Sequence, residues 1–261
     1  MHALCRSLIV AVALVLALSP DTKSAESDVG IVLMHGKWAG PPALPIQTLA
    51  KALRAKGFKV IVPVMPWGEK RMYDVDYPTA LSEIESSVVV LRKKGAKRIL
   101  VAGHSFGANA SIAYAASERE VDGVIAIAPG HAPDLQNFGA SVAKARQMIA
   151  NGKAEETASF DDKSQGRDRT ISTTAKIYLS YFDPDGMGDM PKSAAAIPKP
   201  VPFLWVVGTR DLMMYRQGEN YVFNKVPKHP RNTYLVVNAD HRDTPEVAAA
   251  QIVEWIISLK Y

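Results

Sequence analysis

One pentapeptide constrains the fold more than any other part of the 261-residue sequence, Gly103-His104-Ser105-Phe106-Gly107. An apolar run at 98–102 precedes it and has the character of a buried strand. A run of small residues at 108–116 follows it and is typical of a helix packed close to a sheet. Glycines two residues before and two residues after Ser105 remove side chains that would collide in so tight a turn. The pattern predicts a strand–turn–helix unit that lifts the Ser105 hydroxyl clear of the backbone.

Strand-like and helix-like segments alternate from residue 29 onward. Apolar residues at helical spacing predict helices at 45–56, 78–94 and 245–259. Short apolar runs predict strands at 29–34, 58–64, 98–102, 122–128, 201–207 and 233–237. Buried strands that alternate with helices imply an α/β fold, with a mostly parallel central sheet and helices on both faces.

The alternation is interrupted once, between Pro129 and Pro200. This stretch is too long for an ordinary connection, and it holds a helical piece at 140–150 and an aromatic patch at 178–182. We interpret residues 132–199, with approximate limits, as a helical cap inserted over the carboxyl edge of the sheet. Ligands bind at that edge in open parallel sheets. A surface excursion without a role in binding is the alternative.

Residues 1–25 have the layout of a secretory signal peptide. A short start with Arg6 precedes an apolar run at 8–18 and a polar stretch that ends near Ala25. The apolar run is short for a permanent membrane helix, so we expect no stable membrane anchor, with an anchor as the alternative. The only cysteine, Cys5, lies in this leader. We therefore expect residues 26–261 to form one disulfide-free domain that is exported to the periplasm or secreted.

The charge of the chain is mildly basic, with a formal net value of +5. The densest basic run, at 92–98, falls where a helix is expected to end, and cations are favourable at that end of a helix. No aromatic residue is interleaved with this run, so we expect no nucleic-acid partner.

A serine hydroxyl is a weak nucleophile near neutral pH, so it needs a base and a third group that holds the base. His241 follows the last expected strand and should emerge at the same edge as Ser105. Asp211 follows the fifth expected strand, and its carboxylate could orient the imidazole. Asp134, after the fourth strand, is the alternative acid. The sequence thus predicts a catalytic triad of Ser105, Asp211 and His241.

Backbone N–H groups are needed to receive the negative charge that develops on the substrate oxygen. Phe106, the residue after the serine, should supply one donor. The loop after the first strand contains Gly36, which allows the loop to fold back toward the serine. We therefore predict that the N–H of Lys37 is the second donor of an oxyanion hole.

Taken in order, these elements resemble the α/β-hydrolase family: His35-Gly36, Gly103-x-Ser105-x-Gly107, Asp211 and His241. The resemblance covers the chain after the leader. It implies an α/β-hydrolase fold with a trimmed N-terminus, which lacks the usual leading antiparallel strands. It also implies that neither a metal nor an organic cofactor is needed. Lys37 departs from the small or apolar residue that many members carry at this place.

Large apolar side chains are expected near the same edge of the sheet, where they would line an apolar or aromatic cleft. We expect substrate contacts from Trp38, Trp67, Tyr181, Phe182 and Met213. The expected reaction is hydrolysis of a small-molecule carboxylic ester, with a small to medium apolar acyl or aryl group, through an acyl-serine intermediate. A serine peptidase or amidase and an acyltransferase could use the same triad, and a non-catalytic binding protein could keep the fold.

Overall fold

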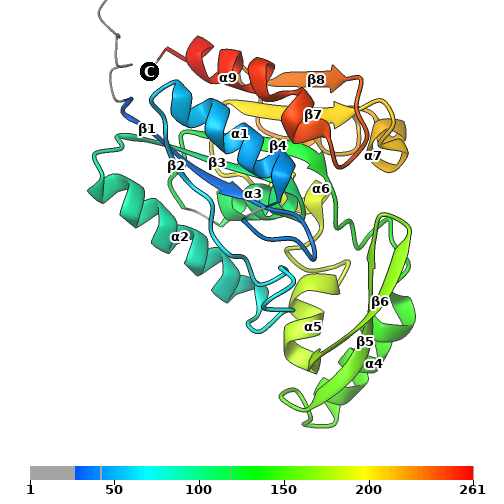
Figure 1. Ribbon diagram of the computed structural model, residues 1–261. Coiled ribbons are helices and arrows are strands. Elements are labelled where there is room, and N and C mark those ends of the chain that lie inside the picture. The colour runs from blue at the N-terminus through cyan, green and yellow to red at the C-terminus, as the bar shows by residue number, and fades with distance from the viewer. Residues whose placement is uncertain (1–26, 42, 118, 261) are drawn as a thin grey trace, which may run out of the picture.

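Six strands form a parallel sheet at the centre of the residues that the computed structural model describes, 27–41, 43–117 and 119–260 (Figure 1). The predicted signal peptide lies outside the described residues. The sheet order is β2-β1-β3-β4-β7-β8, and each neighbouring pair is parallel. The strands are β1 (Val29–Met34), β2 (Lys59–Ile61), β3 (Arg98–Ser105), β4 (Gly123–Pro129), β7 (Phe203–Gly208) and β8 (Thr233–Val237). The predicted α/β architecture is therefore confirmed.

Side chains of the inner strands alternate between two cores, one on each face of the sheet. In β1, Ile31 and Leu33 pack into one core, while Val32 and Met34 pack into the other. The edge strand β2 is shorter than the predicted 58–64 and is only partly buried. Pro63 explains this limit, because a proline has no N–H to continue a ladder of hydrogen bonds.

Helices cover both faces of the sheet (Figure 1). One face carries α1 (Leu44–Ala55), α8 (Thr244–Val247) and α9 (Ala249–Ser258), and the other carries α2 (Tyr77–Lys93) and α3 (Phe106–Ala116). The helix predicted at 245–259 is thus divided into α8 and α9. Two short elements that we did not predict follow β7, α7 (Leu212–Gln217) and the 3-10 turn η1 (Phe223–Lys225). Among the described residues, no helix has the length and hydropathy of a membrane span.

The segment 132–199, which we call the cap segment, lies between β4 and β7. It contains α4 (Gly139–Ala150), β5 (Thr157–Ser164), β6 (Arg167–Thr174), α5 (Ala175–Phe182) and α6 (Met190–Ala195). Strands β5 and β6 form an antiparallel hairpin that lies beside α4, away from the sheet (Figure 1). The cap segment is therefore mixed rather than helical, which corrects the prediction.

Alternating burial explains why a polar stretch forms this hairpin. Phe160 and Asp162 are buried while their neighbours in β5 are not, so one face of the strand turns inward. The turn at Gln165 and Gly166 has positive φ at both residues, 50° and 71°. Two such residues give the turn the twist that a two-residue hairpin loop needs.

Candidate active site

The predicted sharp turn around Ser105 is present, because β3 ends at Ser105 and α3 begins at the next residue. Ser105 has φ 57° and ψ −117°, a backbone conformation that residues other than glycine rarely adopt. A Cβ atom on Gly103 would lie 2.2 Å from the Gly107 carbonyl oxygen. A Cβ atom on Gly107 would lie 2.6 Å from the Met34 carbonyl oxygen. The turn can therefore form only with glycine at both positions.

Two of the predicted catalytic side chains are in direct contact at the carboxyl edge of the sheet. His241 lies after β8, and its Nδ1 donates a hydrogen bond of 2.6 Å to Oδ2 of Asp211, which lies after β7. Both side chains are buried. The alternative acid, Asp134, instead accepts hydrogen bonds of 2.9 and 3.0 Å from the Tyr221 hydroxyl. The geometry therefore selects Asp211 as the partner of His241.

The serine and the imidazole face one small space beside Gly130. A Cβ atom on Gly130 would lie 2.7 Å from Ser105 Oγ and 3.3 Å from His241 Cε1. Among the described residues, the Ser105 hydroxyl and the His241 ring form no direct hydrogen bond, so a side-chain movement must complete this contact. Catalytic hydrogen bonds are often long or misaligned before substrate binds. Glycine at 130 keeps the space between the two groups open.

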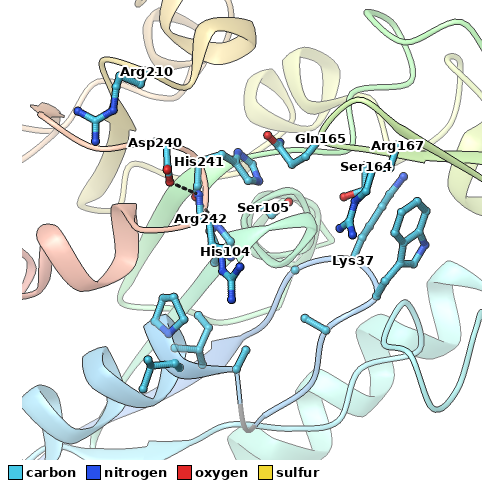
Figure 2. Close-up of a pocket in the computed structure, with 17 residues that line it drawn as sticks. Lys37, His104, Ser105, Ser164, Gln165, Arg167, Arg210, Asp240, His241 and Arg242 are labelled. Carbon is cyan, nitrogen blue, oxygen red and sulfur yellow. Dashed lines mark hydrogen bonds between the residues drawn. The ribbon is translucent and has the colours of Figure 1, made fainter.

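His104 supports the loop that carries His241, a role that the sequence analysis did not identify. Its Nε2 donates a hydrogen bond of 2.8 Å to the backbone carbonyl of His241, and the two rings are 5.0 Å apart (Figure 2). Burial lowers the pKa of His104 to about 3, and the neighbouring His241 adds to this shift. His104 is therefore neutral beside the imidazole. In the sequence, only the position of His104 next to Ser105 indicated that it could take part in the site.

The loop after β1 folds back onto the serine, as predicted. A Cβ atom on Gly36 would lie 2.9 Å from Ser105 Cβ. The loop is held by hydrogen bonds from Trp38 N to the Trp67 carbonyl, 2.9 Å, and from Met65 N to His35 Nε2, 3.0 Å. Within the described part of the chain, the backbone N–H of Lys37 has no acceptor. This leaves it available to a substrate oxygen, although its role and that of the Phe106 N–H stay predictions.

The side chain of Lys37 joins this loop to the cap segment through a buried ion pair. Its ammonium group donates to the Asp162 carboxylate and, at 3.0 Å, to the Lys163 carbonyl oxygen. Asp162 also accepts from Trp38 Nε1 at 2.9 Å and from the Tyr73 hydroxyl at 2.7 Å. Burial lowers the pKa of Lys37, and the Asp162 carboxylate opposes that shift. The sequence analysis did not identify Asp162 as a residue of this site. The pattern that could have indicated it is the alternation of Phe160 and Asp162 with exposed residues along β5.

Three of the aromatic residues predicted to contact substrate instead form the core beneath the cap segment. Trp67, Tyr181 and Phe182 are completely buried. The Trp67 ring stacks on Phe106 with 4.5 Å between centroids, and the other two rings pack against Tyr73 at 5.1 and 5.5 Å. The prediction that these three line the cleft is therefore wrong for this structure, because mutual packing leaves them no free face. They stabilise the active-site loops.

Trp38 does line the pocket that contains Ser105, His104 and His241. Figure 2 shows the last three of these residues at the pocket. This pocket has a volume of about 610 Å³. One wall is apolar and comes from the start of α1, with Leu44 and Ile46. The hairpin turn and the loops after β7 and β8 supply polar and charged groups, so the cleft predicted to be apolar or aromatic is so on one side only. Met213 lies in α7, but its side chain is outside the described part of the structure. No cluster of potential metal ligands occurs among the described residues.

Comparisons with known proteins agree with this architecture. A family model described as "Alpha/beta hydrolase family" matches residues 31–255. Monoacylglycerol lipase from Paleococcus ferrophilus is 23% identical, with a TM-score of 0.63 over 88% of this chain and 94% of that one. Est1E from Butyrivibrio proteoclasticus is 16% identical, with a TM-score of 0.63 over 91% of this chain and 90% of that one. A search of curated proteins finds no match. At these identities, the structural likeness shows a shared fold.

Proposed function

Because the chain belongs to the alpha/beta hydrolase family, we propose that it is a serine hydrolase that cleaves carboxylic esters. The main support is the buried hydrogen bond of 2.6 Å between His241 Nδ1 and Asp211 Oδ2, at the edge where Ser105 emerges. The strained backbone of Ser105 is a second support. Such strain costs about 1–3 kcal/mol and persists mainly at functional sites.

In the proposed acylation step, Ser105 Oγ attacks the ester carbonyl carbon while its proton passes to His241 Nε2. Asp211 keeps the other ring nitrogen protonated and stabilises the imidazolium that forms. The negative charge on the tetrahedral oxygen is received by the backbone N–H groups of Lys37 and Phe106. The leaving alcohol then takes the proton from His241, which leaves an acyl group on the serine.

In the proposed deacylation step, His241 takes a proton from a water molecule, whose oxygen attacks the acyl-serine. The second tetrahedral intermediate collapses, Ser105 regains its proton and the carboxylic acid leaves. The apolar wall at Leu44 and Ile46 suits a small to medium apolar group of the ester. All protein groups in this scheme are side chains or amides of the chain itself.

A fluorophosphonate probe tests the proposal directly. The probe should form a covalent adduct at Ser105, located by mass spectrometry, and Ser105→Ala should abolish both labelling and ester hydrolysis. Ser86→Ala is a matched control, because Ser86 is exposed on α2 and outside the pocket. Labelling at another residue, or unchanged hydrolysis in Ser105→Ala, would exclude the mechanism. An ester and an amide with the same chromogenic leaving group distinguish esterase from amidase activity, and added alcohol reveals acyl transfer.

Export of the protein is a separate proposal, supported by the layout of residues 1–25 in the sequence. Expression of the full chain in a bacterial host with a secretory pathway should yield a processed protein outside the cytoplasm. Mass spectrometry of this protein should show that its N-terminus lies at residue 25 or 26. A full-length chain retained in the cytoplasm would contradict the proposal.

A further inference from the structure

Three arginines surround the pocket that contains Ser105 (Figure 2). Arg167 belongs to the cap hairpin, Arg210 follows β7 and Arg242 follows β8, so they come from three different parts of the chain. All three are exposed. Their guanidinium groups bring positive charge to the rim of a cleft whose base holds the proposed nucleophile.

None of these three guanidinium groups forms an ion pair with a carboxylate among the described residues. Arg167 lies over the ring of Trp38, 5.7 Å from its centroid, and Arg210 donates to the amide oxygen of Asn238. Among the described residues that line this pocket, the acidic one is Asp240, which accepts 2.9 Å hydrogen bonds from the backbone N–H groups of Arg242 and Asp243. These hydrogen bonds hold its carboxylate within its own loop, where it offsets part of the positive charge.

Some arginines elsewhere on the described surface have a carboxylate within 4 Å, namely Arg71, Arg98, Arg119 and Arg146, and others, such as Arg92 and Arg216, do not. What distinguishes Arg167, Arg210 and Arg242 is that all three lie around one pocket. Lys37, the remaining cation of the pocket, is also neutralised, by buried Asp162. The described lining of the pocket thus combines a single carboxylate with three guanidinium groups that form no ion pair, and an excess of one sign of charge at a cleft attracts ligands of the opposite sign.

From this arrangement we infer that the substrate is an ester that carries a second, negatively charged group. The inference rests on the proposed function and specifies its substrate class. The apolar part of the molecule lies along the wall formed by Leu44 and Ile46, and the anionic end meets the arginines. Guanidinium groups donate two parallel hydrogen bonds to a carboxylate or a phosphate, so either anion fits this rim.

A series of ethyl esters that share a six-carbon acyl chain and differ in its terminal group tests the inference. Ethyl hexanoate is neutral, monoethyl adipate ends in a carboxylate, and ethyl 6-aminohexanoate ends in an ammonium group. At low salt, kcat/KM should be about 10-fold higher for the carboxylate ester than for the neutral ester, and lowest for the cationic ester. The difference should shrink in 1 M NaCl, where charges are screened beyond about 3 Å. An ester with a terminal phosphonate distinguishes a preference for phosphate from one for carboxylate.

Arginine variants connect this preference to the rim. Arg167→Gln, Arg210→Gln and Arg242→Gln should each lower the ratio of kcat/KM between the anionic and neutral esters by about 2- to 5-fold, as expected for single exposed charges. Substitution of the same arginines by lysine keeps the positive charge, so it should lower this ratio of kcat/KM values less than substitution by glutamine does. Arg92→Gln is the matched control, because Arg92 is exposed in the last turn of α2, away from the pocket. Equal ratios in all variants, or no preference in the unmodified protein, would overturn the inference.

Failure of the proposed function gives a different result. Binding of adipate to the Ser105→Ala variant, measured by calorimetry against hexanoate, needs no catalysis. Suppose that adipate binds more strongly than hexanoate, that the arginine substitutions weaken its binding, and that the unmodified protein hydrolyses no ester. This result would support the anion-binding site and reject the proposed esterase activity. Ester hydrolysis without a charge preference would keep the esterase and reject the anion site.

Discussion

The sheet edge and the cap hairpin each present one buried carboxylate to the active-site region, and the two differ in what they bind. Asp211, at the sheet edge, accepts from His241, whose ring gains and loses a proton in the proposed reaction. Asp162, in the hairpin, accepts from Lys37, Trp38 and Tyr73. None of these three donors takes part in the proposed proton transfer. Burial of a carboxylate therefore does not identify a catalytic group, whereas the kind of partner does.

The largest expected effect separates these roles by removing the charge of Asp211. In Asp211→Asn, the side chain can no longer stabilise an imidazolium or hold the required tautomer of His241. We expect kcat for ester hydrolysis to fall by about 10⁴-fold. Steady-state kinetics measures the loss, and thermal unfolding checks that the variant is folded. A fall of less than about 10-fold would assign the orienting role to another group.

The second prediction applies to the carboxylate in the hairpin. Asp162→Leu leaves the Lys37 ammonium group buried without its partner, so the free energy of unfolding should decrease by about 3–5 kcal/mol. The double variant Lys37→Met with Asp162→Leu should recover most of the loss, because no uncompensated charge remains. Urea unfolding of both single variants and the double variant measures the coupling. Additive losses would show that the pair is not the source of the stability.

A third, smaller effect concerns His104, whose pKa is about 3 in the folded protein against a usual value of 6.5. Between these values, the unfolded chain binds a proton that the folded chain does not, so stability falls as the pH decreases from 6.5 toward 3. His104→Gln keeps a donor for the His241 carbonyl but removes this titration. The slope of unfolding free energy against pH should decrease by up to about 1.4 kcal/mol per pH unit.

His35 and His131 are also buried, and burial lowers the pKa of each, so part of the acid sensitivity should persist in His104→Gln. Denaturant unfolding at several values between pH 4 and 7 provides the comparison with the unmodified protein. An unchanged slope would show that His104 is not the neutral buried group described above.

The smallest expected effect is at Asp134, the alternative acid considered from the sequence. Its carboxylate accepts from Tyr221 rather than from His241. Asp134→Asn should therefore change kcat by less than about 2-fold, since a surface hydrogen bond of this kind contributes little. The same esterase assay that is used for Asp211→Asn measures both variants side by side. A large loss of kcat in Asp134→Asn would reverse the assignment of the acid.

The parts of the site that could be predicted from the sequence are those fixed by local geometry. Ser105, Asp211 and His241 each follow a recognisable strand, and the ends of parallel strands meet at one edge. The glycines around Ser105 are required by contacts within a few residues. The limits of the strands at 29–34 and 233–237 were also predicted correctly, because apolar runs bounded by polar residues mark buried strands.

The parts that could not be predicted depend on how distant segments pack. Asp162 meets Lys37 across 125 residues, and nothing near either residue specifies the other. Trp67 and Tyr181 have the size and polarity of cleft residues as well as core residues, and only the packing of the cap segment decides between these. The hairpin β5–β6 has mostly polar side chains, so its alternation was hidden by the absence of an apolar stripe.

The ion pair between Lys37 and Asp162 also limits how the enzyme can admit its substrate. If the hairpin swung outward as a lid, it would separate two charges that are enclosed by Phe106, Phe138 and Phe182. Opening would also break the hydrogen bonds that Trp38 Nε1 and the Tyr73 hydroxyl donate to Asp162, so the contacts of this carboxylate hold the hairpin against the loop after β1. We therefore expect substrate to enter and leave between the start of α1 and the loop after β8, without outward movement of the hairpin.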